Sequence, residues 1–465
     1  MPSVVYTEPT HSGPAYNDMK LLYLTKNLLP TLLLSVFCNS INASEFLIED
    51  LNRDKNKQQT WVVLPYVFSS DSMGFTMGAV GIFAGYIQPQ MSIVATTFIG
   101  EELEVKHNDL RESETERTSG AMLAINGYRP SFSNRLFVSA IGAYGYYPNQ
   151  RLYIEGGNDS EKDLENNDYN ATTPLQTQGY NNWFKGDVRF VLPWGESKNQ
   201  VLPKIQLQRG IAVNRDHIGG GAPFSTGQTL IGSEIFYSKW TADKFLESQE
   251  INTNGVRLFL EHDNTDYPSN PSRGYAFSAK ASADFGTGNS TQSWNSLEVD
   301  YSHYLEFENV SWSRQSVVAL NVWSAYSPSW KDSETLYDNG SLKKHQTPMW
   351  EGARLGGWTR MRAYDNNRFN DKAALYGAIE YRIIPRINPL ADLAWNPIPV
   401  DWFQFVLFAE AGRVAEKYDV GLLLSDMKYD VGFSIRALAA KVPVRFEMAF
   451  GEEGSAMWFM LKQPF

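Results

Sequence analysis

The sequence is poor in cysteine, in long hydrophobic runs and in positive charge. Its 465 residues include a single cysteine, Cys38, in a segment that we expect to be removed. The mature chain would then have no thiol, which excludes disulfide scaffolds, thiolate metal sites and cysteine nucleophiles. After residue 43 there is no apolar run of about 18 residues, so no membrane-spanning helix is predicted. Acidic residues outnumber basic ones by 52 to 41, which argues against a general nucleic-acid binder.

The N-terminus carries the pattern of a secretory signal peptide over residues 19–43. A basic start that includes Lys20 is followed by an apolar stretch at 28–38 and then by small residues. A membrane anchor is the alternative, but about 11 apolar residues interrupted by a proline are too few to cross a bilayer. Residues 1–18 are polar. We interpret them as a non-native upstream extension and take Met19 as the true start.

Beyond about residue 60, apolar and polar residues alternate almost throughout, which predicts β-strands and no amphipathic helix. We expect a short periplasmic segment at 44–74 and a barrel over 75–465. If the first strand starts at the periplasm, residues 101–118 become a periplasmic turn, although such turns are normally short. The sixteen predicted strands are 75–86, 91–100, 119–128, 135–146, 182–193, 204–213, 230–240, 255–264, 274–285, 293–307, 316–327, 374–384, 402–414, 428–439, 442–450 and 456–465.

One strand shows what lies on each side of the predicted sheet. Leu297, Val299 and Tyr301 share one face, and the opposite face carries acids that include Glu298 and Asp300. A soluble all-β sandwich would also have one apolar face. Acids repeated on the other face suit a water-filled lumen with lipid outside, and the signal peptide favours the same reading. The sequence therefore predicts an all-β fold, a transmembrane antiparallel β-barrel of 16 strands in the bacterial outer membrane.

The C-terminus supports the outer-membrane interpretation. Apolar residues lie two or four positions apart and end in a terminal phenylalanine. This ending resembles the C-terminal signal strand of bacterial outer-membrane barrels. Its apolar face would consist of Met457, Phe459, Leu461 and Phe465.

The stretch GGWTRMRAYDNNRF, residues 356–369, has two glycines, three arginines and three aromatic residues between two predicted strands. A solvated loop has little use for that mixture. From about residue 60 to its end, the chain resembles the BamA/TamA superfamily of outer-membrane proteins, the bacterial surface-antigen barrels. The resemblance implies that the sixth external loop folds into the lumen and presents a motif that corresponds here to Met361, Arg362, Ala363 and Tyr364. After the loop, Glu380-Tyr381-Arg382 and Glu410-Ala411-Gly412 resemble the acid-bearing strands of the family.

Strand parity places the acids on the same side as the predicted lumen. In 375–383 the apolar face leaves Glu380 and Arg382 pointing inward, and in 403–411 it leaves Glu410 pointing inward. A guanidinium can pair with carboxylates through its planar fork. We hypothesise that Arg362 docks between the two glutamates and holds the loop inside. The alternative is a solvated charged loop.

The resemblance implies a role in protein insertion or secretion. Assembly members of the family carry periplasmic POTRA domains, whereas the roughly 30 residues after the leader are too few for one small domain. We therefore expect a short member without POTRA domains, in contact with outer-membrane lipid and possible client proteins, that needs a separate periplasmic partner. A stand-alone pore or solute channel is the alternative.

An enzyme is the weakest interpretation. The sequence has no G-x-S-x-G, H-E-x-x-H or phosphate-binding loop. The acidic loop at 156–168 lacks EF-hand spacing. We assign no catalytic residue, no cofactor and no metal, and we expect no nucleic-acid partner.

Overall fold

The computed structural model describes most of the chain beyond residue 59. The predicted upstream extension, 1–18, and the predicted signal peptide, 19–43, lie outside the described residues. In the described part of the chain, no helix has the length and apolar character needed to cross a membrane. The described residues are 49–50, 60–70, 73–104, 115–153, 157, 174–202, 204–213, 221–222, 224–242, 249–336, 342–389, 400–439 and 442–465.

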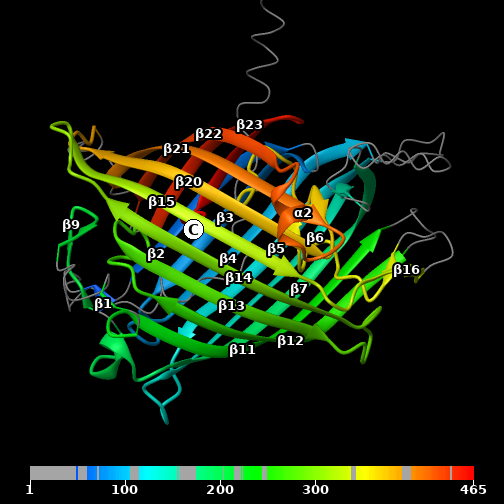
Figure 1. The fold of residues 1–465 in the computed structure, drawn as a ribbon, viewed down its shortest axis with the longest axis horizontal. Helices are drawn as coiled ribbons and strands as arrows, with labels where there is room; N and C mark the ends of the chain where they lie inside the picture. Colours follow the sequence, from blue (N-terminus) through cyan, green and yellow to red (C-terminus); the bar gives the residue numbers. More distant parts are fainter. Residues whose placement is uncertain are drawn as a thin grey trace, which may run out of the picture.

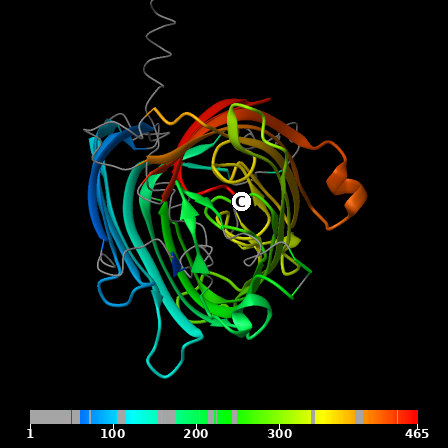
Figure 2. The ribbon, with the colours of Figure 1, turned by 90° about the vertical axis from the view of Figure 1, so that its left-hand side faces the viewer.

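One antiparallel sheet of sixteen strands dominates the described structure (Figure 1). Seen from its end, the sheet curls round into a barrel with chain segments inside it (Figure 2). The predicted all-β class and the count of 16 strands are confirmed. In sheet order the strands are β2 (Thr60–Ser70), β3 (Gly74–Ala84), β4 (Ser92–Glu104), β5 (Thr115–Tyr128), β6 (Leu136–Leu152), β7 (Leu175–Val191), β11 (Gln228–Ala242), β12 (Gln249–Asp263), β13 (Gly274–Asp284), β14 (Trp294–Glu306), β15 (Ser313–Tyr326), β20 (Ala373–Pro385), β21 (Val400–Ala415), β22 (Lys428–Ala439), β23 (Val442–Gly451) and β24 (Gly454–Leu461).

Short elements fill the connections between these strands. They are β1 (Glu49–Asp50), the 3-10 helix η4 (Gly195–Lys198), β8 (Lys204–Ile205), β9 (Leu207–Gln208), β10 (Ile211–Ala212), β16 (Lys331–Thr335), β17 (Lys343–Lys344), β18 (Arg354–Leu355), β19 (Phe369–Asn370) and the helix α2 (Val420–Leu424).

The sheet begins earlier than the sequence pattern indicated. Strand β2 pairs with β3 from Thr60 to Ser70, inside the range 44–74 that we expected to be a periplasmic segment. Pro65 interrupts the strand pattern there, because proline cannot donate a ladder hydrogen bond. The proline is tolerated because β2 is the first strand of the sheet and therefore an edge strand.

The predicted strand at 204–213 is wrong, and this error cancels the missed β2 in the strand count. Strand β9 pairs with β10 as a tight hairpin separate from the large sheet. Its two-residue turn is Arg209-Gly210, with φ angles of 48° and 71°, as a type I′ hairpin turn requires. Apolar residues alternate on both sides of the turn, so the hairpin resembles one strand in the sequence.

The additional strand β2 also changes the end of the sheet at which β4 and β5 are connected. Residues 101–104 belong to β4 and residues 115–118 belong to β5. Because connections alternate between the two ends of an antiparallel sheet, the β4–β5 connection lies at the same end as the connection 327–372, not at the end expected for a periplasmic turn. We call this end the loop end, and we call the opposite end, where the connection 192–227 lies, the turn end. Figure 1 shows α2 and β16 at the loop end and β9 at the turn end.

The two faces of the strands differ as the alternation predicts. On β21, Phe405 and Leu407 are 48% and 64% exposed on the outer face, whereas Gln404 and Glu410 are buried on the inner face. Exposed apolar side chains repeat in this way on most strands of the sheet. Such a surface requires an apolar surrounding, because exposed apolar patches of this extent are unusual in soluble monomers.

The inner wall of the barrel changes character around the ring. On β2 to β6 the inward residues form a buried apolar cluster that includes Tyr66, Val80, Phe98 and Met122. On β20 to β23 the inward residues include buried arginines and glutamates. The loop 327–372 contacts the charged part of the wall through Arg362.

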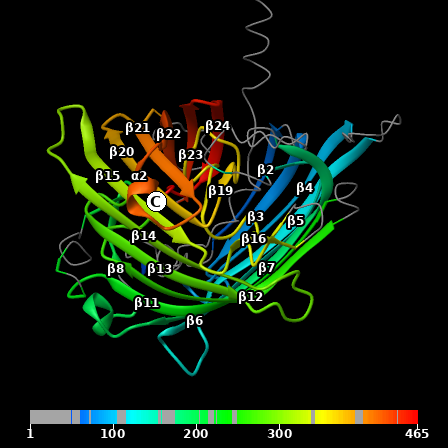
Figure 3. The same cartoon turned by 45° about the vertical axis from the view of Figure 1, so that its right-hand side comes forward.

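The first and last strands are the edges of the sheet. The strand order runs from β2 to β24, and within the described residues no strand pairing joins these two. Figure 3 shows both edges at the same side of the barrel.

Candidate functional site

The connection 327–372 contains its own small framework. Strand β18 pairs with β19, which brings Leu355 beside Phe369 and closes the tip, residues 356–368, into a compact loop. Gly356 and Gly357 have φ angles of 105° and 106°, which only glycine adopts without strain. The glycine pair in the sequence therefore starts the tip.

Within the tip, the left-handed backbone conformation that favours glycine occurs at Met361 and not at Ala363. The φ of Met361 is 56°, and a short bond from the amide of Tyr364 to the carbonyl oxygen of Met361, 3.1 Å, closes the turn. Ala363 is therefore compatible with the tip. The space for its methyl group comes from Gly451 on β23, where an added Cβ would lie 2.9 Å from the Cβ of Ala363.

Arg362 is completely buried among carboxylates from three strands. Its Nε donates to Oε1 of Glu410 at 3.0 Å, and its Nη1 lies 2.9 Å from Oε1 of Glu380 and 2.9 Å from Oε1 of Glu447. The amide of Arg362 donates to Oε2 of Glu410 at 2.7 Å. The guanidinium also lies 3.5 Å from the ring centre of Phe408. The two predicted acids and a third that was not predicted thus meet one arginine.

The network extends through three further arginines. Arg382 and Arg436 each bond to Glu380 at 2.8 Å, and Arg436 also reaches Glu447 at 3.1 Å. Arg445 completes the group through Glu447. Four guanidinium groups therefore face three glutamates, and all seven side chains are at most 2% exposed. Buried charges at this density persist only when they are paired and hydrogen-bonded.

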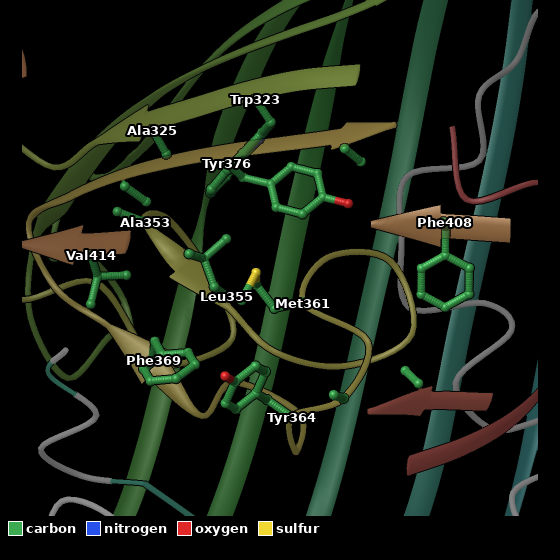
Figure 4. Close-up of a cluster of buried hydrophobic side chains, with 14 residues drawn as sticks. Trp323, Ala325, Ala353, Leu355, Met361, Tyr364, Phe369, Tyr376, Phe408 and Val414 are labelled. Carbon is green, nitrogen blue, oxygen red and sulfur yellow. The ribbon is translucent and has the colours of Figure 1, made fainter. Parts of the chain in front are cut away.

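Apolar packing surrounds the charged contacts (Figure 4). From the loop, Leu355, Met361, Tyr364 and Phe369 join a cluster with wall residues that include Phe408. The rings of Tyr364 and Phe369 meet edge to face, 5.0 Å between centres. Each such side chain contributes about 1.5–3 kcal/mol when fully buried. The loop is held by packing as well as by charge.

The tip also contacts the last two strands of the sheet. The indole nitrogen of Trp458 on β24 donates to the carbonyl oxygen of Arg362 at 2.6 Å. Arg445 on β23 donates to the carbonyl oxygen of Trp358 at 2.9 Å. Arg368 forms a bidentate salt bridge with Glu453, which lies between β23 and β24. Its Nε donates to Oε2 at 2.7 Å and its Nη2 donates to Oε1 at 2.6 Å.

The loop is fixed on the opposite wall as well. Tyr153, directly after β6, donates to Asp365 at 2.6 Å, and Arg257 on β12 pairs with Glu351 at 2.6 Å. Burial alone would raise the pKa of Glu351, but the charges of Arg257 and of neighbouring cations outweigh it and lower the pKa. Because its contacts lie on both sides of the ring, the loop crosses the interior.

Inward parity could have identified the missed members of the network. Arg436 on β22, and Arg445 and Glu447 on β23, alternate on the inner face of strands that the sequence predicted. Their shared contact with Arg362 was hidden, because it depends on how far the loop reaches. Asp430 was missed too; its Oδ2 accepts from the amide of Ala363 at 3.1 Å.

The C-terminal residue lies elsewhere than expected. Strand β24 ends at Leu461, and Lys462 has a φ of 67°, where the chain leaves the strand. Phe465 packs against buried lumen residues that include Tyr304, and its carbonyl oxygen accepts from Arg382 at 3.3 Å. Phe465 therefore does not continue the face of Met457 and Phe459, which lie opposite the buried Trp458 and Met460 on β24. Figure 2 shows the C-terminus inside the ring of strands.

Comparison with known proteins identifies a family. Residues 125–455 match the Omp85 superfamily domain. No curated protein matches the chain in sequence.

Several solved structures resemble the chain at low sequence identity. BamA from Haemophilus ducreyi lacking POTRA domains 1–3 is 11% identical, with 86% of this chain and 69% of that chain covered and a TM-score of 0.44. CdiB from Acinetobacter baumannii is 9% identical, with coverages of 86% and 59% and a TM-score of 0.45. CdiB from Escherichia coli is 9% identical, with coverages of 86% and 61% and a TM-score of 0.47. The chain thus spans less than two thirds of either CdiB chain.

Proposed function

Because the chain belongs to the Omp85 superfamily, we propose that it helps other proteins to insert into or cross the outer membrane, under the control of the loop 327–372. The observation that carries this proposal is the burial of Arg362 among Glu380, Glu410 and Glu447. Counted from β2, this loop is the sixth connection at its end of the sheet, and we take that end to be external.

The contacts of the loop tip make the last five strands one block. Glu380 lies on β20, Glu410 on β21, Asp430 on β22, Glu447 on β23 and Trp458 on β24, and all five side chains bond to residues 362–363. A block of this kind would hold the β24 edge in place while the β2 edge moves.

Edge strands can pair with an incoming chain. An edge presents a row of backbone donors and acceptors, which an extended segment of another protein can join as an added strand. The edges of β2 and β24, which no strand pairing joins within the described residues, would be available to such a client at the membrane. We further propose that a separate periplasmic protein delivers clients to the turn end.

Vesicles of phosphatidylethanolamine and phosphatidylglycerol containing the full chain provide the test. A urea-unfolded eight-stranded outer-membrane barrel is added, and its folded fraction is followed over time by its heat-dependent gel shift. We expect faster folding than with empty vesicles and loss of the gain in Arg362→Ala. Arg360→Ala is the matched control, because Arg360 lies in the same tip but pairs with the partly exposed Asp300.

Equal client folding in loaded and empty vesicles, with or without periplasmic extract, would overturn the proposal. Acceleration without extract would show that the periplasmic partner is not required. Large steady currents from the wild-type chain, together with no acceleration, would point to a solute pore.

A further inference from the structure

The turn end of the barrel carries a second segment that folds across the lumen. The hairpin at 204–213, which we call the cap hairpin, belongs to the connection between β7 and β11. Four strands, β12 to β15, separate β11 from β20 in the sheet. The tip of the cap hairpin nevertheless contacts β20, β21 and β22, so it crosses the mouth of the barrel.

The tip packs on inward-facing apolar residues. Ile211 joins a buried cluster with Ile384, Trp402 and Leu438, one from each of the three strands β20, β21 and β22. Their even numbers place all three on the inner face that carries Glu380, Glu410 and Arg436. The three wall side chains are at most 1% exposed, so the hairpin covers them closely.

Hydrogen bonds fix the turn of the cap hairpin at its destination. The indole nitrogen of Trp402 donates to the carbonyl oxygen of Gly210 at 2.9 Å. Arg314, at the start of β15, donates to the carbonyl oxygens of Gln208 and Arg209 at 3.3 and 3.4 Å. Gly210 sits so close to the wall that an added Cβ would lie 2.6 Å from Leu438. A larger residue at this position would require a small shift of the hairpin or of the Leu438 side chain.

The base of the cap hairpin rests on a second inward connection. Ile205, Leu207 and Ala212 pack with Tyr267 of the connection 264–273. Asn270 in that connection bonds to Gln315 on β15 at 2.8 Å and to Gln404 on β21 at 3.0 Å. Polar and apolar contacts therefore continue across the mouth.

We propose that the cap hairpin is a second closure of the lumen, at the turn end, and that it acts independently of the loop 327–372. Either closure alone then suffices to block ions. The inference concerns the lumen alone and holds whether or not the chain handles client proteins.

The first test measures conductance in planar bilayers. The full chain is compared with Arg362→Ala, with a deletion of residues 206–213, and with both changes together. The matched control is a deletion of residues 130–134 combined with Arg362→Ala; it shortens the β5–β6 connection at the same end, where Phe132 is 81% exposed.

Only the combined variant should conduct strongly, at least about fivefold above either single variant and above the matched control, since a sixteen-stranded barrel without plugs encloses an aqueous channel. A current in Arg362→Ala alone as large as in the combined variant would overturn the proposal. So would a folded combined variant that stays closed.

A cross-link tests the position of the cap hairpin without removing it. An added Cβ on Gly210 would lie 2.8 Å from the Cβ of Asp401, and a disulfide needs about 3.5–4.5 Å between Cβ atoms, a shift of about 1 Å. In a Cys38→Ser background, Gly210→Cys with Asp401→Cys should cross-link on mild oxidation. Gly210→Cys with Asp426→Cys, at the loop end, should not. Failure of the first pair to cross-link in folded protein would overturn the proposal, even if the deletion variants do not fold.

Discussion

At the scale of single residues, the charge of Arg362 matters most to Glu410. Glu380 keeps Arg382 and Arg436 when Arg362 is removed, and Glu447 keeps Arg436 and Arg445. In the described part of the chain Glu410 has no second arginine partner, and it keeps only neutral donors, the hydroxyl of Tyr376 and the backbone amide of residue 362. Loss of Arg362 therefore leaves its largest uncompensated charge at Glu410.

A double-mutant cycle tests this uneven distribution. Arg362→Ala should lower the free energy of unfolding by about 3–5 kcal/mol, the usual cost of breaking a buried ion pair. Adding Glu410→Ala should cost less than its effect alone, because it removes the stranded carboxylate. The measurement is urea-induced unfolding in detergent. Arg360→Ala should cost about 1–2 kcal/mol, less than Arg362→Ala, since its ion pair is partly exposed and its other contact is stacking on Trp323. Additive effects of the two substitutions would contradict the assignment.

The family resemblance pointed to Glu380 and Glu410, and parity along a strand, which fixes the direction of a side chain, placed both on the inner face. The same reasoning applied to Arg436 and Glu447 would have placed them inward. Parity could not predict their contact with Arg362, since contacts between a loop and a distant strand depend on the path of the whole loop. Phe465 was misplaced because alternation gives no sign that the chain leaves the strand at Lys462.

At the scale of elements, glycines on the inner face of two strands make room for the loop. An added Cβ on Gly412 of β21 would lie 2.8 Å from Leu355 and 3.1 Å from the sulfur of Met361, and Gly451 of β23 lies against Ala363 and Tyr364. The strands are therefore shaped to accept the tip at these points.

Gly451→Leu should displace the tip and destabilise the protein by about 1–3 kcal/mol, because overpacking of a filled site forces shifts of this order. The thermal unfolding midpoint in detergent measures the effect. Gly377→Ala is the control, because an added Cβ there meets nothing closer than 3.8 Å. Equal midpoints for wild type and Gly451→Leu would show that the tip does not occupy this space.

Strand prediction succeeded where alternation ran between clear turns and failed where a turn preserved the alternation. The hairpin at 204–213 keeps apolar residues at Ile205, Leu207 and Ile211 on either side of Arg209-Gly210, so period two continued through it. Strand β2 was missed for the opposite reason. Pro65 interrupts its strand pattern, although proline is tolerated in an edge strand. The total of sixteen was correct because the two errors cancelled.

At the scale of the whole molecule, segments from far apart in the sequence meet in the lumen. The loop 327–372 binds the wall from β6 to β24, the C-terminal residue lies inside the ring, and the cap hairpin crosses the turn end. Alternation predicted the barrel, since a lipid-facing exterior must be apolar. It gave no information on what fills the interior, where contacts join residues more than 80 positions apart.

Limited trypsin digestion of the folded chain in detergent tests the central claim, that Arg362 holds the loop tip inside the barrel. The loop keeps trypsin sites at Arg354, in β18, and at Arg360 and Arg368, in the tip, when Arg362 is replaced. The account predicts that wild type and Arg360→Ala stay intact between residues 354 and 372, whereas Arg362→Ala is cut there, as read by mass spectrometry of the fragments. Cleavage of this region in the wild type, or equal resistance of Arg362→Ala, would contradict it.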